Sequence, residues 1–160
     1  MGKSGDRDKM NVHFIKSPEK RKIVEQLKNQ FGISDLPYLL FETGKEKIRG
    51  FSGSLSKEEI FELAKIAHVE IIGIYLINKE RSNDLRFSFD ATQILQSQIT
   101  SSIVEINADQ FKLWIKGHDL DIKTEKGTVV IKYQSDFLGC GKSNGEKIFN
   151  YVPKDRRLRK

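Results

Sequence analysis

From Ile103 to the C-terminus the apolar residues fall into short runs separated by turns, and this pattern constrains the fold most. Residues 111–116 alternate between apolar side chains and basic or aromatic ones, and Gly117 then breaks the run. A second β-rich run covers 128–133, and a third covers 147–152. Several short strands with frequent turns within about 60 residues are typical of a small barrel. We therefore predict a β pseudobarrel in the last third of the chain.

The earlier part of the chain carries helix signals as well as strand signals. Ser17-Pro18 is typical of a helix start, and Gly32 of a helix end. Ser56 and Glu59 have the spacing of a capping box. Asp90 is placed to cap a further short helix. Strand-like runs lie at 38–41, 48–51, 69–77 and 85–89.

Together these patterns predict an α+β fold in which an α/β part precedes the pseudobarrel. We expect a disordered tail at residues 1–10, an α+β domain at 11–98 and the pseudobarrel domain at 99–160. The polar segment from Gln96 to Ser102 marks the expected boundary.

The net charge of the chain, +6, is carried entirely by its C-terminal part. Residues 1–110 contain 16 basic and 16 acidic side chains, whereas residues 111–160 contain 12 basic and 6 acidic ones. Such asymmetry indicates a polyanionic partner for one part of the molecule. The alternative is a solvated basic tail that has no partner.

The residues that could carry catalysis do not form a recognisable site. Gly141-Lys142-Ser143 resembles the end of a phosphate-binding loop, but the first glycine of that motif would fall on Asp136. Cys140 has no base nearby in the sequence, and a cysteine among apolar neighbours is more often a core residue. Three histidines are far apart and lack metal-ligand spacing: His13, His68 and His118. We therefore expect a protein that is not an enzyme and that has no metal and no cofactor.

The sequence shows none of the features that are typical of a membrane-spanning or secreted protein. No apolar run approaches the ~18–20 residues that a membrane-spanning helix needs. The segment from Met1 to Met10 is too polar for a secretory signal. The single cysteine excludes an internal disulfide. We expect a cytoplasmic protein that binds no membrane.

Three segments of the C-terminal part, 111–120, 129–133 and 136–142, resemble a PUA domain, the small RNA-binding pseudobarrel of RNA-modifying and ribosome-assembly proteins. The last segment is similar to the closing hairpin of that family, with its two glycines at Gly139 and Gly141. The length and domain order resemble those of the archaeal and eukaryotic pre-rRNA processing factor, which joins an α/β pre-PUA domain to a PUA domain.

A second resemblance is to the RNA-binding tail of the RsmF rRNA cytosine methyltransferases. Their pattern of LG-x-G-K followed by N-x-x-PK-x-x-R is matched here by residues 138–142 and 150–157. The cofactor loop and catalytic cysteine motif of the methyltransferase have no counterpart in this sequence. The resemblance therefore implies binding without chemistry, with rRNA or pre-rRNA as the partner, alongside ribosome-assembly or RNA-modification proteins.

We expect the RNA to be held by basic side chains, with a few aromatic or amide groups that contact bases or sugars. Trp114 either stacks a base between two lysines or is buried, and Asn150 and Tyr151 either contact RNA or pack within a strand. If five cations meet phosphates of one strand, the log–log salt slope would be about −3.5. The candidate residues are Lys112, Trp114, Lys116, Lys142, Lys147, Asn150, Tyr151, Lys154, Arg156, Arg157, Arg159 and Lys160.

A rival hypothesis keeps the same fold but changes the working surface. In it the chain is an adaptor of an RNA-modification complex, and the N-terminal domain is the contact surface for another protein. Any RNA binding would then be incidental.

Overall fold

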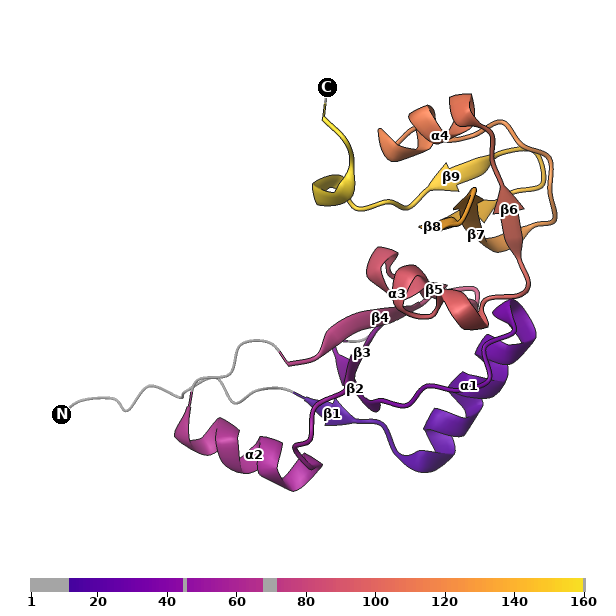
Figure 1. Ribbon diagram of the computed structural model, residues 1–160. Helices are drawn as coiled ribbons and strands as arrows, with labels where there is room; N and C mark the ends of the chain where they lie inside the picture. The colour runs from indigo at the N-terminus through magenta and orange to yellow at the C-terminus, as the bar shows by residue number, and fades with distance from the viewer. Residues whose placement is uncertain (1–11, 45, 68–71, 160) are drawn as a thin grey trace.

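Two β-sheets, one from each half of the chain, form the framework of the protein (Figure 1). The computed structural model describes residues 12–44, 46–67 and 72–159. The predicted tail at 1–10 lies outside the described residues, as do His68 and Lys160.

The first sheet has five antiparallel strands in the order β1-β2-β3-β4-β5. The strands are β1 (His13–Phe14), β2 (Leu39–Thr43), β3 (Lys47–Phe51), β4 (Ile74–Lys79) and β5 (Leu85–Phe87). The helices of this half are α1 (Ser17–Phe31), α2 (Lys57–Ile66) and α3 (Phe89–Ile94), followed by a 3-10 turn, η1 (Gln96–Gln98).

The helix-end signals of the sequence place α1 and α2 nearly correctly. Gly32 ends α1 in the left-handed conformation, with φ +83°. Ser56 and Glu59 form the predicted capping box of α2. The start of α1 differs by one residue, because Lys16 occupies the N-cap position that we assigned to Ser17.

Two expectations in this half need correction. Ser88, not Asp90, caps α3, because the Ser88 hydroxyl accepts a hydrogen bond from the Ala91 N–H at 3.1 Å. The strand predicted at 69–77 corresponds to β4, which begins at Ile74; residues 69–71 of that prediction lie outside the described residues. Gly73 precedes it at φ +67°, and a Cβ there would lie 2.5 Å from the carbonyl oxygen of Gly50.

The second sheet has four strands in the order β6-β7-β8-β9. They are β6 (Ile103–Glu105), β7 (Gly127–Tyr133), β8 (Asp136–Ser143) and β9 (Ile148–Asn150). β6 pairs with β7 in parallel, and the other neighbours are antiparallel. The same half contains α4 (Ala108–Ile115) and a 3-10 turn, η2 (Lys154–Arg156). The α+β class is confirmed.

The strand that we predicted at 111–116 is wrong, because these residues belong to α4 and its C-terminal cap. Asn107 and Gln110 form a capping box, in which each side chain accepts a hydrogen bond of 2.9 Å from the other residue's backbone N–H. Three apolar residues at alternate positions do not distinguish a short helix from a strand. The capping spacing of Asn107 and Gln110 is the sequence signal that distinguishes them.

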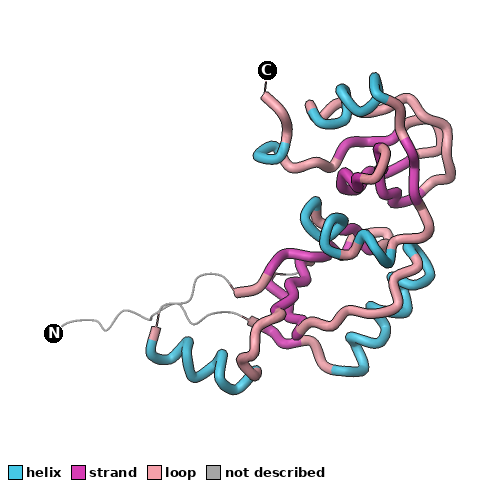
Figure 2. Tube along the Cα trace, in the orientation of Figure 1, coloured by secondary structure: helices cyan, strands magenta, loops and turns pink. Residues whose placement is uncertain are grey.

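Both faces of the second sheet are covered. On one face α4 packs through Trp114 against residues that include Val129, Ile131 and Leu138. On the other face Val130 and Cys140 belong to the same core cluster as residues of α1 and the first sheet. Figure 2 shows α4 on the outer side of this sheet and α3 on the side toward the first sheet.

The contact between α3, β5 and β8, which we call the inter-sheet seam, joins the two halves. The Thr92 hydroxyl accepts a hydrogen bond from the Gly139 N–H at 3.2 Å, and the Gln93 amide donates to the Phe137 carbonyl. Gly139 has φ +78°, and a Cβ there would lie 3.0 Å from the ring of Phe89. Glycine at this position therefore allows α3 to approach β8 closely. The domain boundary near residue 99 stays a prediction.

Candidate nucleic-acid interface

Trp114, one of our candidate RNA contacts, lies in the core. Its side chain has an exposed fraction of 0%, and its indole Nε1–H donates to the Leu138 carbonyl at 2.8 Å. In the predicted strand, Trp114 would share a face with Lys112 and Lys116. In the helix α4 and its C-terminal cap these two lysines, four residues apart, lie on a different side from Trp114. The alternative of stacking a base on Trp114 between these two lysines is therefore wrong.

Four of the candidate cations are paired with carboxylates. Within the C-terminal half, Lys112 lies 3.7 Å from Asp109 and Lys147 lies 3.5 Å from Asp121. Two further pairs cross the inter-sheet seam and join Lys142 to Asp84 at 2.5 Å and Arg156 to Asp90 at 2.8 Å. The count of 12 basic side chains in residues 111–160 therefore overstates the charge available to a polyanion.

Four other cations gather where α4 ends, and we call them the tail cluster: Lys116, Lys154, Arg157 and Arg159. Within the described part of the chain none of the four forms an ion pair. Lys116, Lys154 and Arg159 are exposed, and Arg157 is half-buried. These side chains are the best-placed phosphate contacts among our candidates.

One backbone hydrogen bond and one side-chain hydrogen bond hold the chain at Arg157 and Leu158 against the end of α4. The Leu158 N–H donates to the Ile115 carbonyl at 2.8 Å, and the Arg157 Nε–H donates to the Val152 carbonyl at 2.9 Å. The Arg157 side chain lies over Gly117, where a Cβ would be only 2.5 Å from Arg157 Cδ. Positive charge at a helix C-terminus is favourable, because the macrodipole is negative there. The fold therefore stabilises this concentration of cations.

Asn150 has a structural role. Its Nδ2 donates to the Trp114 carbonyl at 2.8 Å and to the His118 carbonyl at 3.0 Å. Its Oδ1 accepts from the Val152 N–H at 2.8 Å. Because the protein bonds both ends of this amide, the structure favours the packing alternative for Asn150, and an RNA contact there stays a prediction. The residue ties β9 to the end of α4.

Tyr151 is the remaining candidate RNA contact, and its side chain is 38% exposed. The guanidinium carbon of Arg86, from β5, lies 4.5 Å from the centre of its ring. Its place on the surface therefore adjoins the inter-sheet seam. Sequence reasoning missed Phe149, which is 39% exposed in the neighbouring strand β9. The two aromatic residues at alternate positions, Phe149 and Tyr151, are the signal that could have found it.

Residues 101–158 match the family model described as the methyltransferase RsmF PUA domain. The C-terminal half carries a PUA domain of the RsmF type. The RsmF resemblance of the sequence is thereby confirmed, and the resemblance to the pre-rRNA processing factor stays a prediction.

Curated relatives extend the similarity beyond the PUA domain. The chain is 31% identical over 85 residues to ribosomal RNA small subunit methyltransferase F of Vibrio vulnificus. The aligned region covers 52% of this chain and 18% of that protein. It is 26% identical over 140 residues to the protein of the same name from Psychromonas ingrahamii. That aligned region covers 83% of this chain and 28% of the relative. An alignment of this length includes residues of the first sheet. The matched region is thus less than a third of either relative.

The glycine and lysine that suggested a phosphate-binding loop lie within the PUA domain's sheet. Gly141, Lys142 and Ser143 are the last residues of β8, where they pair with both β7 and β9. An extended strand does not wrap its N–H groups around a phosphate as such a loop does. This segment therefore has a structural position in the PUA domain.

The thiol of Cys140 is expected to resist alkylation in the folded protein. Burial raises its pKa to about 12, because the charged thiolate is poorly solvated in the core. At about pH 8 only roughly one thiol in 10,000 would be ionised, and the thiolate is the nucleophile. Iodoacetamide labelling followed by mass measurement should show an unmodified protein in buffer and complete modification in urea. Rapid labelling of the folded protein would contradict this buried position.

The described residues show neither a metal centre nor a membrane helix. Across the described ranges of the chain, no group of three or more His, Cys, Asp or Glu side chains could hold a metal ion. No helix in that same part of the chain is long and apolar enough to cross a bilayer.

Proposed function

We propose that this chain binds RNA through its PUA domain and that its target is the RNA of the small ribosomal subunit. The relatives that it resembles are named as methyltransferases of that RNA. Their similarity to this chain includes the PUA domain, so the shared part is the one to which RNA binding is best assigned. The setting is rRNA processing, modification or ribosome assembly in the cytoplasm.

The observation that carries this proposal is the tail cluster. A basic side chain that meets a phosphate releases a condensed counterion, and the entropy of that release favours binding. Arginine can in addition hold a phosphate with two parallel hydrogen bonds. The cluster presents cations that form no ion pair with a described carboxylate, on a segment fixed to the end of α4.

The role that we propose is binding rather than catalysis. Cys140 is buried with a raised pKa, which disfavours nucleophilic chemistry at the only thiol of the chain. The matched regions make up 18% and 28% of the two methyltransferases, so their activity does not transfer to this chain. We propose that the chain supplies RNA recognition to a process whose chemistry lies elsewhere.

The affinity of the wild-type protein for single-stranded RNA is expected to fall steeply as salt increases. Four phosphate contacts from the tail cluster predict a log–log slope of about −2.8, because each contact contributes about −0.7 on a single strand. Filter binding or fluorescence anisotropy, with fragments of small-subunit rRNA at several salt concentrations, measures the slope. An absence of binding at low salt would contradict the proposal and favour the adaptor hypothesis.

A further inference from the structure

Strand β9 and the segment that follows it expose two aromatic rings, Phe149 and Tyr151, on one side. Ile148 and Val152 are buried, whereas Phe149 and Tyr151 are 39% and 38% exposed. In an extended chain residues i and i+2 point to the same side, so the two rings share a face. Within the described ranges no other aromatic ring stacks on either of them. These are large apolar surfaces that the fold leaves in water.

The spacing of the two rings suits a nucleic-acid base. The rise along an antiparallel strand is about 3.4 Å per residue, so side chains at i and i+2 lie about 6.8 Å apart. Successive stacked bases are about 3.4 Å apart. A flat base inserted between the two rings would therefore contact both of them at stacking distance.

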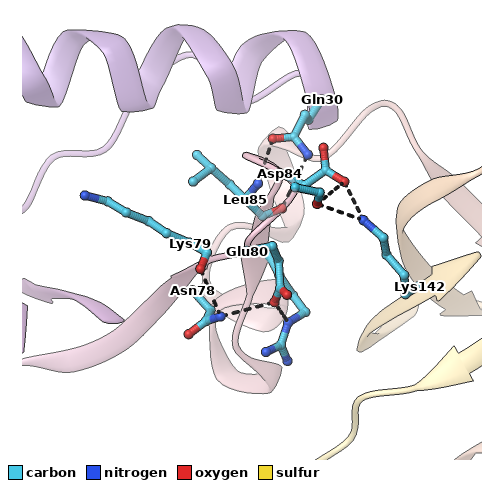
Figure 3. Close-up of polar contacts among 9 residues, drawn as sticks. Gln30, Asn78, Lys79, Glu80, Asp84, Leu85 and Lys142 are labelled. Atoms are coloured by element: carbon cyan, nitrogen blue, oxygen red, sulfur yellow. Dashed lines mark hydrogen bonds and ion pairs between the residues drawn. The ribbon is translucent and has the colours of Figure 1, made fainter. Parts of the chain in front are cut away.

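The charges beside these rings favour a base over a phosphate. Lys142 lies opposite Phe149 in the β8–β9 register, and the Arg86 guanidinium covers part of Tyr151. Each of these cations is already paired, Lys142 with Asp84 and Arg86 with Glu80, both at 2.5 Å. Figure 3 shows Lys142 reaching across the inter-sheet seam to Asp84. The charges of these four groups cancel in pairs, so neither cation is free for a phosphate.

The tail cluster adjoins the aromatic face. The Arg157 Nε–H donates to the carbonyl of Val152, the residue after Tyr151, at 2.9 Å. An RNA strand whose phosphates contact the tail cluster would therefore bring its next nucleotides to the two rings. The base in such a nucleotide must be unpaired, because a paired base is already stacked within its helix and does not present a free face.

We propose that Phe149 and Tyr151 form a stacking site for an unpaired RNA base, with Lys142 and Arg86 at its border. This inference rests on the proposed function, because it identifies the form of RNA that the same surface selects. The occupant is a nucleotide in a single strand or loop. Stacking of a base on an aromatic ring tolerates any base, so we expect selectivity for unpaired RNA and little preference for sequence.

The test compares single-stranded RNA with a fully paired duplex of the same length by fluorescence anisotropy. We expect Phe149→Ala and Tyr151→Ala each to lower the affinity for the single strand roughly fivefold or more. Affinity for the duplex should stay within about twofold of wild type, since the tail cluster is unchanged. Phe149→Trp should retain single-strand binding, because it preserves an aromatic face.

Phe61→Ala is the matched control. Phe61 is a phenylalanine that is 40% exposed on α2, outside the PUA domain, so its truncation should leave both affinities unchanged. The inference is overturned if wild-type protein binds RNA with the expected salt slope while both alanine variants bind the single strand as wild type does. Equal losses on strand and duplex would also overturn it. If wild type binds neither RNA, the proposed function itself has failed.

Discussion

Replacement of Lys116, Lys154 and Arg159 together by alanine is expected to lower the affinity for single-stranded RNA about 100-fold at about 0.1 M salt. Each lost phosphate contact removes about 0.7 from the salt slope, which corresponds to about fivefold in affinity at that salt concentration. The slope should fall from about −2.8 to about −0.7. All three side chains are exposed, so the fold should be retained. Fluorescence anisotropy over a series of salt concentrations gives both quantities.

A second triple variant controls for net charge. Arg21, Lys22 and Lys28 are exposed on α1 in the other half of the protein, and their replacement by alanine removes the same three charges. We expect this variant to bind within about threefold of wild type and to keep the wild-type slope. Similar losses in the two variants would show that net charge, and not the tail cluster, governs binding.

Trp114→Ala is expected to destabilise the PUA domain by about 3–5 kcal/mol, the range observed when a large aromatic side chain is removed from a core. The indole is fully buried between α4 and the sheet, so its removal leaves a cavity. It also removes the donor to the Leu138 carbonyl. Because Trp114 is the only tryptophan, urea unfolding must be followed by circular dichroism.

Leu113→Ala is the matched control for that variant. Leu113 is the neighbouring residue on α4 and is 46% exposed, so its truncation should change the free energy of unfolding by less than about 1 kcal/mol. A Trp114→Ala variant as stable as Leu113→Ala would show that Trp114 does not pack in the core, and it would reopen the stacking role that the structure excludes.

The two ion pairs across the inter-sheet seam change how the basic segment of the chain is interpreted. The sequence made Lys142 and Arg156 candidate RNA contacts, but they form ion pairs with Asp84 and Asp90 of the other half. Partly exposed pairs of this kind contribute little stability. Their clearer consequence is that neither cation is free for a phosphate, which leaves the tail cluster as the described candidate cations without an ion pair.

The sequence by itself determined the features that depend on near neighbours. Gly32 ends α1 and Ser56 caps α2, because left-handed geometry and side-chain caps are decided within a few residues. The same local signal at Asn107 indicated α4, although the alternation at 111–116 led to the wrong prediction of a strand. The excess of positive charge near the C-terminus was also evident from the sequence.

Only the tertiary structure decided which of those charges are free and which aromatic rings face water. The partners of Lys142 and Arg156 lie 58 and 66 residues away along the chain, and an ion pair needs contact within about 4 Å. No local pattern encodes such an approach, because it depends on how α3 and β5 pack on β8. The same packing and that of α4 bury Trp114 and leave Phe149 and Tyr151 exposed.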